Sequence, residues 1–151
     1  MKTQNLTCNF NWKQLSSTEA DLKKLSKKTL MNILFQTYLI HHFEMEVLRL
    51  KNNDCVWGPV HSSVGQEAIA SATIAALRKE DKITGSHRAH HQFLAKALNF
   101  VLDEKWDPER DELSAQAREV VRKTLAEIMG LAPGYCGGRG GSMHLRYEEA
   151  G

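Results

Sequence analysis

The chain has 151 residues, of which 42% are hydrophobic and 25% charged, the balance of one folded domain with an apolar core. Its 20 basic and 18 acidic residues give a formal net charge of +2 and are spread evenly along the sequence. Such a charge gives no support to nucleic acid or to an anionic membrane surface as a partner. We therefore expect a globular protein that binds neither.

Residues 1–12 lack an apolar run long enough for a signal peptide, and no later stretch approaches the ~18 uninterrupted apolar residues of a membrane span. The three cysteines, Cys8, Cys55 and Cys136, lie far apart and form no CxxC pair. We expect free thiols, because neither a disulfide framework nor a zinc-type spacing is present. The cytoplasm is the expected location.

The first third of the chain predicts one long helix, straight or bent. Ser16 and Glu19 fit a capping box, and apolar residues then recur at helical spacing from Leu22 to about Leu50. The polar run at 52–54 ends this helix, and the Gly-Pro pair that follows marks a turn.

Further helices alternate with short connections. An alanine-rich stretch predicts a helix over 64–79, and helical spacing predicts two more over 89–98 and 113–129. Residues 83–84 are a candidate for a short strand. The charged segment 103–112 carries a proline and is expected to be an exposed loop. We see no internal repeat and no domain boundary.

Residues 58–68, Gly-Pro-Val-His-Ser-Ser-Val-Gly-Gln-Glu-Ala, place a histidine just before a predicted helix start. Gln66 and Glu67 open that helix, where free amides and the positive end of the dipole suit an anion or a polar ring. Ordinary helix-start chemistry accounts for the same two residues equally well. His61 is a candidate general acid or base, and an exposed or hydrogen-bonded loop histidine is the alternative.

Residues 86–91, Ser-His-Arg-Ala-His-His, offer a second candidate binding segment. Arg88 is the candidate for a diphosphate, because its planar guanidinium pairs with two phosphate oxygens and stays charged. A surface or ion-paired arginine is the alternative. The neighbouring histidines, with His41 and His42 upstream, raise the question of a metal. No carboxylate or cysteine stands at a zinc-type spacing beside them, so we expect no metal ligands in this chain.

Half of the residues from 130 to 141 are glycine, which no regular element favours. The segment 137–144, Gly-Gly-Arg-Gly-Gly-Ser-Met-His, lacks the Lys-Ser/Thr ending of a Walker loop and is not a GxGxxG motif opening a helix. Its backbone can close over a ligand and hold Ser142 and His144 beside it. The alternative is a tightly packed connection without a ligand.

In their order and spacing these pieces resemble the thiamine-diphosphate-dependent first component (E1) of 2-oxo acid dehydrogenase complexes. The resemblance is to the N-terminal part of the alpha subunit, as in pyruvate, branched-chain 2-oxo acid and acetoin dehydrogenases, and it covers about residues 30–145. The features that carry it are the pair Phe43-Glu44, the Gly-Pro-Val-His turn, Gly65-Gln-Glu-Ala68, Arg88 with His90, and Gly140-Gly-Ser-Met-His144.

The resemblance implies an α/β thiamine-diphosphate-binding fold, of which this N-terminal fragment is mostly helical with few short strands. Residues 1–151 would be an incomplete part of that domain. We expect an extension at about 1–15 and an insertion at about 99–122, where the chain is longer than the family's usual connection. Whether the beta part is fused to this chain or separate stays open.

The resemblance also implies roles for single residues. It makes His61 the catalytic histidine that faces the thiazolium and the substrate, and Arg88 the diphosphate ligand. His87 stands where the family usually has a cofactor-contacting tyrosine, and an imidazole there can still donate to phosphate. Ser142 and His144 fall in the loop that lines the cofactor cleft.

The family's Gly-Asp-Gly motif and later asparagine, which supply hard oxygen ligands to magnesium, are absent from this sequence. We therefore expect the magnesium ligands outside this chain, together with the glutamate that the beta part contributes. The implied cofactors are thiamine diphosphate and magnesium. Alone, the chain is expected to bind them poorly.

The implied reaction is oxidative decarboxylation of a small 2-oxo acid with acyl transfer to a lipoyl-bearing acyltransferase, in an oligomer with the beta part. Two alternatives stay open. One is another thiamine-diphosphate enzyme of the transketolase type, and the other is a non-catalytic helical fragment that makes subunit contacts. If the protein continues beyond Gly151, we expect this piece to show an apolar face that the remainder covers.

Overall fold

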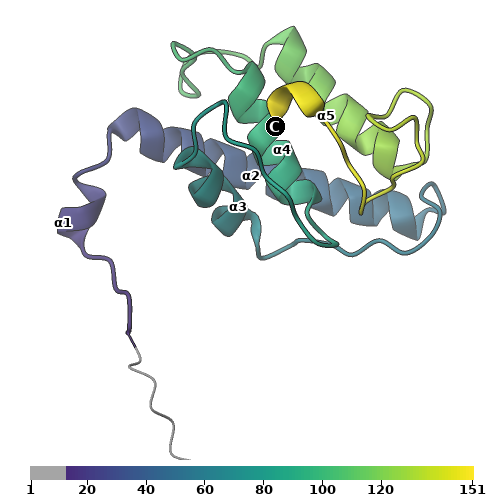
Figure 1. Cartoon of the computed structure of the whole chain (residues 1–151), viewed down its shortest axis with the longest axis horizontal. Helices are drawn as coiled ribbons and strands as arrows, with labels where there is room; N and C mark the ends of the chain where they lie inside the picture. Colours follow the sequence, from purple (N-terminus) through teal and green to yellow (C-terminus); the bar gives the residue numbers. More distant parts are fainter. Residues whose placement is uncertain (1–12) are drawn as a thin grey trace, which may run out of the picture.

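The computed structural model describes residues 13–151 (Figure 1). Cys8, the stretch 1–12 and most of the expected extension at 1–15 lie outside the described residues. The helices are α1 (Glu19–Leu22), α2 (Lys27–Asn52), α3 (Glu67–Ala75), α4 (His90–Val101), α5 (Ala115–Ile128) and the short 3₁₀ helix η1 (Glu148–Ala150).

The predicted long N-terminal helix is interrupted near its start. Thr18, not Ser16, caps α1, and its amide and hydroxyl both donate to the Asp21 carboxylate, at 3.1 and 2.8 Å. The helix restarts after Ser26, whose hydroxyl accepts the Thr29 amide at 3.0 Å. Two successive caps explain the break, because each satisfies amide groups that a continuous helix would bond internally.

The later helices are confirmed with shifted bounds: α3 and α5 are shorter than predicted, whereas α4 continues to Val101 instead of ending near residue 98. α2 ends at Asn52, as predicted, and Asp54 then adopts a left-handed conformation with φ 56°. α3 starts at Glu67 because Gly65, with φ +90°, lies outside the helical region. α5 starts after Ser114, whose hydroxyl accepts the Ala117 amide at 3.1 Å.

The strand predicted at residues 83–84 is wrong, since residues 82–87 form an irregular segment and no strand occurs within 13–151. A strand needs a neighbour that shares its backbone hydrogen bonds, and no described segment pairs with this one. The described part of the chain is therefore helical. The α/β thiamine-diphosphate-binding fold stays a prediction.

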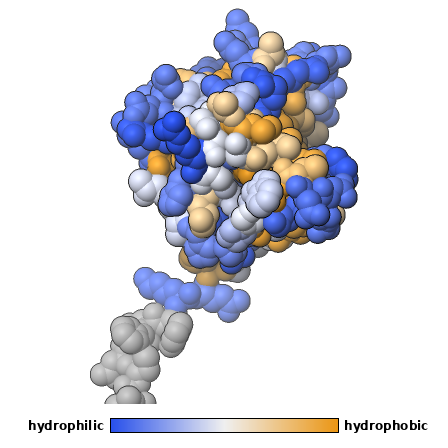
Figure 2. All heavy atoms as spheres, turned by 90° about the vertical axis from the view of Figure 1, so that its right-hand side faces the viewer, coloured by the Kyte–Doolittle hydropathy of each residue, from blue (hydrophilic) through white to orange (hydrophobic). Residues whose placement is uncertain are grey.

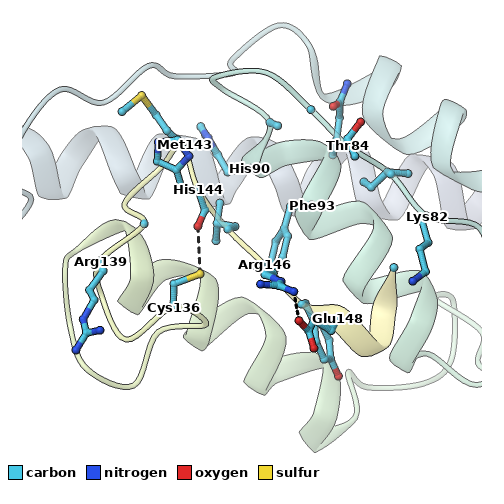
Figure 3. Close-up of a pocket in the computed structure, with 18 residues that line it drawn as sticks. Lys82, Thr84, His90, Phe93, Cys136, Arg139, Met143, His144, Arg146 and Glu148 are labelled. Atoms are coloured by element: carbon cyan, nitrogen blue, oxygen red, sulfur yellow. Dashed lines mark hydrogen bonds and ion pairs between the residues drawn. The ribbon is translucent and has the colours of Figure 1, made fainter.

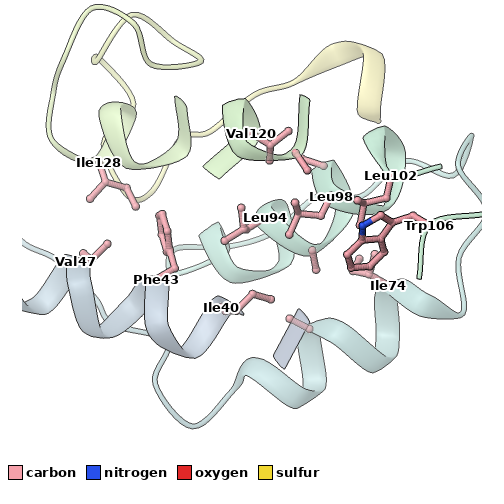
Figure 4. Packing of buried hydrophobic residues seen from close by; sticks show 14 of the residues in the cluster. Ile40, Phe43, Val47, Ile74, Leu94, Leu98, Leu102, Trp106, Val120 and Ile128 are labelled. Carbon is pink, nitrogen blue, oxygen red and sulfur yellow. The ribbon is translucent and has the colours of Figure 1, made fainter. Parts of the chain in front are cut away.

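The core is built around α4, which packs against α2, α3, α5 and η1. Leu94 and Leu98 are fully buried and lie between Ile40 of α2 and Val120 of α5 (Figure 4). Both leucines follow the helical period, so one face of α4 carries the centre of the core. The N-terminus of α4, where the Arg-Ala-His-His motif begins the helix, is held in place by this packing.

The loop 103–112 is not wholly exposed as predicted. Trp106 is buried, its ring centroid lies 4.9 Å from that of Phe35, and its Nε1 donates to the Glu112 carbonyl at 3.1 Å. Burial of the large indole ring, whose N–H finds a backbone acceptor, favours folding of this segment against the core. The segment 99–122 thus supplies core contacts, and its status as an insertion stays a prediction.

Large apolar side chains remain at the surface, among them Trp57, Ile69 and Tyr38. Figure 2 shows a face on which hydrophobic residues form a band between hydrophilic ones. Such surface is typical of faces that other protein segments cover. Cys55 and Cys136 are free thiols, as expected. Within residues 13–151, no helix has both the length and the apolar character needed to cross a bilayer.

Replacing Leu94 by alanine should lower the free energy of unfolding by about 2–5 kcal/mol, because the removed side chain leaves a cavity in a fully buried site. Leu34→Ala is the matched control, since Leu34 is a half-exposed leucine of α2, and its expected loss is much smaller. Urea unfolding followed by circular dichroism measures both. Equal losses would contradict the central position of α4.

Candidate active site

A buried carboxylate and a buried imidazole join the motifs found in the sequence. His90, the first residue of α4, places Nε2 2.6 Å from Oε1 of Glu44 on α2, and both side chains are fully buried. The contact is an ion pair when the imidazole carries its second proton. It is not aligned as a regular hydrogen bond, so its attraction is chiefly electrostatic.

The second oxygen of Glu44 holds the loop that carries His61. Its Oε2 accepts the Ser63 amide at 2.9 Å and the Ser62 hydroxyl at 3.3 Å. The Ser63 hydroxyl in turn donates to the Arg88 carbonyl at 3.2 Å. The first two motifs are therefore fixed to each other through Glu44 and Ser63.

The glycine-rich segment joins the same network. The Ser142 carbonyl lies 3.3 Å from Nδ1 of His90, and because a carbonyl can only accept, this nitrogen is the donor. Ser142 is buried. His90 thus bridges Glu44 on one side and the third motif on the other.

The predicted catalytic and phosphate-binding residues lie beside this network. The rings of His61 and His87 meet edge to face with centroids 5.3 Å apart, and both side chains are exposed. Arg88 follows in a left-handed conformation with φ 65°. Such a conformation costs a non-glycine residue about 1–3 kcal/mol and persists where surrounding contacts hold it, as the Ser63 hydroxyl does here.

A small hollow of about 290 Å³ opens at the N-terminus of α4. We call it the α4 hollow, and its lining residues are Gln66, Ile69, Ser86, His87, Arg88, Ala89, His91 and Gln92. None of these side chains is acidic. The free amides at the start of α4 and the Arg88 guanidinium therefore make its surroundings suited to an anion.

A larger open cleft of about 1000 Å³, shown in Figure 3, shares Ala89 and Gln92 with the lining of the α4 hollow. Side chains from α4, from the segment 82–85 and from the chain after α5 line this cleft. His144 is among them, with Lys82, Arg139 and an Arg146 that pairs with Glu148. The cleft therefore has a mainly basic rim.

The structure thus divides the predicted site residues into two groups. His61, His87 and Arg88 lie together beside the α4 hollow, whereas His144 lines the large cleft. Ser142 lines neither of these cavities, and its carbonyl contacts the buried His90. Their chemical roles stay predictions.

The glycine-rich loop is shaped by a residue that sequence reasoning missed, Glu127 at the end of α5. Its fully buried carboxylate accepts three backbone amides, those of Cys136 and Gly140 at 2.6 Å and that of Gly138 at 2.9 Å. A Cβ on Gly138 would lie 2.4 Å from a Gly130 backbone carbon, and its φ is +75°. Glycine is therefore required where the loop closes over the carboxylate.

Glu67 has a structural partner that supports the helix-start interpretation. Its Oε1 lies 2.8 Å from Nδ1 of His41, and its Oε2 accepts the Gly65 amide at 2.8 Å. Burial alone would raise the pKa of this carboxyl, but the contacts with His41 and Gly65 outweigh it and lower the pKa. Among residues 13–151, no group of three His, Cys, Asp or Glu side chains is arranged to hold a metal ion.

Sequence reasoning missed the roles of Glu44 and Glu127 for different reasons. Glu44 was noted only as the acidic half of an aromatic-acidic pair. Its position on the buried face of α2 was a usable signal, because a charged residue at a core-facing position needs a partner. Glu127 lies in an otherwise ordinary helix, and nothing local indicates that a glycine loop folds back onto it.

Curated proteins include several relatives. The chain is 35% identical over 112 residues to the alpha subunit of acetoin:2,6-dichlorophenolindophenol oxidoreductase from Bacillus subtilis, covering 74% of this chain and 27% of the relative. It is 32% identical over 129 residues to the mitochondrial pyruvate dehydrogenase E1 component subunit alpha of Kluyveromyces lactis, covering 83% and 26%. The Saccharomyces cerevisiae subunit of that name is 32% identical over 120 residues, covering 80% and 24%.

No family model and no solved structure matches the chain. It spans about a quarter of the length of the curated relatives. Similarity over most of the chain to several such proteins defines its class as that of E1 alpha subunits. The chain belongs to the family of pyruvate and acetoin dehydrogenase alpha subunits, and the predicted resemblance is confirmed.

Replacing Glu44 by alanine should lower the free energy of unfolding by about 3–5 kcal/mol, because it leaves His90 and the Ser63 amide buried without their partner. The Ser63 amide should also exchange with solvent faster. Glu46→Ala on the same helix is the control, since Glu46 pairs with Arg49 at the surface, where solvent screens the pair. Denaturant unfolding and amide exchange by NMR test this, and unchanged Ser63 protection would contradict it.

Glu127→Gln should flatten the acid end of the stability profile. Burial opposes ionisation of Glu127, yet the amides of Gly138, Gly140, Cys136 and Gly141 together lower its pKa below the ordinary 4.5. As the pH falls, the unfolded chain binds this proton first. The stabilisation is therefore present above pH 4.5 and is lost as the pH falls through the lower folded pKa.

Denaturant unfolding between about pH 3 and pH 6 measures this slope. The exposed Glu112 provides the control Glu112→Gln, whose profile should follow that of the wild type. A Glu127→Gln profile as steep as the wild-type profile would show that this carboxylate does not carry the effect.

Proposed function

We propose that this chain forms part of the alpha subunit of a thiamine-diphosphate-dependent E1 component. That enzyme would decarboxylate a 2-oxo acid oxidatively and pass the acyl group to a lipoyl group. One observation carries the proposal: three segments that are distant in sequence, and that match the family, converge on the Glu44–His90 pair. The named alpha-subunit relatives support the same reaction class.

The residues around the α4 hollow fit the diphosphate of such a cofactor. Arg88 lines the hollow and has no ion-pair partner within residues 13–151, so its guanidinium is available to two phosphate oxygens. His87, also in the lining, would donate to the same group. No carboxylate lines the hollow to repel an anion.

His61 is the proposed proton-transfer residue. It is exposed next to His87, so a substrate held beside the diphosphate-binding residues would meet an imidazole that can donate or accept a proton. The same imidazole would contact the substrate carboxylate. Bound thiamine diphosphate supplies the electron sink that decarboxylation needs.

Ser142 and His144 would form the other wall of the cofactor cleft. The Ser142 carbonyl orients His90, and His144 lies in the large cleft beside basic side chains. We assign the magnesium ligands and the activating glutamate to parts of the enzyme outside this chain. The partners would be the beta part and a lipoyl-bearing acyltransferase.

The relatives are named as E1 alpha subunits, which favours this proposal over a transketolase-type enzyme or a non-catalytic contact fragment. Their names include mitochondrial and chloroplastic forms, so the cytoplasmic location stays a prediction. The choice among pyruvate, branched-chain 2-oxo acids and acetoin stays open.

Arg88→Ala should weaken binding of thiamine diphosphate with magnesium by roughly 10- to 150-fold, the effect of losing a hydrogen bond to a charged group. Calorimetry on the complete E1 protein that contains this chain, assembled with its beta part, measures the affinity. Arg122→Ala is the control, because Arg122 pairs with Glu119 on the exposed side of α5. Equal affinities of wild type and Arg88→Ala would remove Arg88 from the site.

Reduction of 2,6-dichlorophenolindophenol by the same protein tests the reaction itself. The expected result is reduction that depends on thiamine diphosphate and on a 2-oxo acid, either pyruvate or a branched-chain one. Reduction with acetoin alone, which has no carboxylate to lose, would contradict the decarboxylation. A complete protein that neither binds the cofactor nor reduces the dye would rule out the E1 function and favour a contact role.

A further inference from the structure

His91 has a buried nitrogen, Nδ1, that makes no regular hydrogen bond, although the backbone carbonyl of Arg88 acts on the same imidazole. It is the second residue of α4 and only 4% exposed, and its Nδ1 has no hydrogen-bond partner in the described part of the chain. An unsatisfied buried polar atom costs about 1–3 kcal/mol. Because His91 also lines the α4 hollow, a ligand bound in that hollow is positioned to supply a partner for this imidazole.

The surroundings of His91 indicate the chemistry of that partner. His91 lines the α4 hollow together with Arg88, and the lining has no acidic side chain. The hollow measures about 290 Å³, while a water molecule takes about 30 Å³ of liquid, so a group much larger than one water fits. A guanidinium, a helix N-terminus and an imidazole around one space favour an anion with several acceptor oxygens.

His91 meets that anion as a hydrogen-bond donor rather than as a cation. Burial and the neighbouring His90 lower the pKa of His91 below 6.5, against the opposing influence of Glu44, the Arg88 carbonyl and Glu67. A neutral imidazole still carries one N–H group. In the tautomer protonated at Nδ1, this buried N–H is the hydrogen-bond donor. The contact therefore persists at neutral pH without a second buried charge.

We propose that His91 is an anion-binding residue whose Nδ1–H donates, beside Arg88, to the terminal phosphate of a diphosphate ligand. This rests on the proposed function, which takes the ligand to be thiamine diphosphate. His91 follows the Arg-x-His motif that carries the family resemblance, and that motif assigns it no role. His91 would therefore raise the affinity of this chain for diphosphate beyond what the family motif provides.

Three substitutions of His91 separate this role from a packing role. His91→Phe keeps a ring and removes both nitrogens. His91→Asn places an amide near the position of Nδ1, and His91→Gln places one near that of Nε2. His42→Phe on the exposed surface of α2 is the control for replacing a histidine ring.

Calorimetry on the complete E1 protein uses two probes, inorganic diphosphate and thiamine diphosphate with magnesium. His91→Phe and His91→Gln should weaken both by roughly tenfold or more, while His91→Asn stays within a few-fold of wild type. Thermal unfolding without ligand identifies a variant that fails to fold. If His91→Phe fails to fold, the affinities of His91→Asn and His91→Gln still test the role of Nδ1.

Affinities that are the same in all His91 variants would overturn the proposal, as would equal losses in Asn and Gln. If Arg88→Ala still weakens both probes in that case, the proposed function stands and only the role of His91 falls. If the wild-type protein binds neither probe, both proposals fail together. Loss with thiamine diphosphate but not with inorganic diphosphate would show that His91 contacts another part of the cofactor, which also overturns the assignment.

Discussion

The buried pair of Glu44 and His90 is the constraint on which the candidate site depends. Removing two ionisable groups from water costs several kcal/mol each unless each finds partners. Here the partners come from loops: the Ser63 amide completes Glu44, and the Ser142 carbonyl completes His90. Glu44 Oε2 and His90 Nδ1 gain these hydrogen bonds only when both loops close over the contact between α2 and α4, while Glu44 Oε1 and His90 Nε2 face each other. The packing of α2 against α4 and the positions of the site loops therefore depend on each other.

A second buried carboxylate, that of Glu127, also depends on loop amides for its hydrogen bonds. Glu127 accepts three amides of the glycine-rich loop, so that loop gains a fixed shape without secondary structure. The two carboxylates differ in what they organise. Glu44 links elements that are far apart in sequence, whereas Glu127 folds the chain back on the helix that precedes it. Together they fix the loop that carries His61 and the glycine-rich loop.

The histidines show how environment divides one residue type among several tasks. His90 is fully buried and holds the motifs together, while His61 and His87 meet at the surface, where a ligand can reach them. His91 lies between these extremes, since it is buried but faces a hollow. In the proposed function, the exposed rings contact the ligand and transfer protons, the buried His90 positions the loops, and the buried His91 contacts the phosphate. The chain spans about a quarter of its relatives, so the remaining walls of such a site would come from elsewhere.

The sequence by itself determined the helices, the glycine-rich loop and the family, because periodicity, caps and short motifs are local features. It placed the end of α2 correctly, yet it missed the break before Ser26 and the burial of Trp106. It predicted a strand at residues 83–84, which no neighbouring strand supports. Only the tertiary structure decided that His90 is the buried bridge between the motifs, and that Glu44 and Glu127 are the carboxylates that organise the loops. Which side chains are buried, and which distant groups pair, depends on how the helices pack. A local sequence pattern does not contain that information.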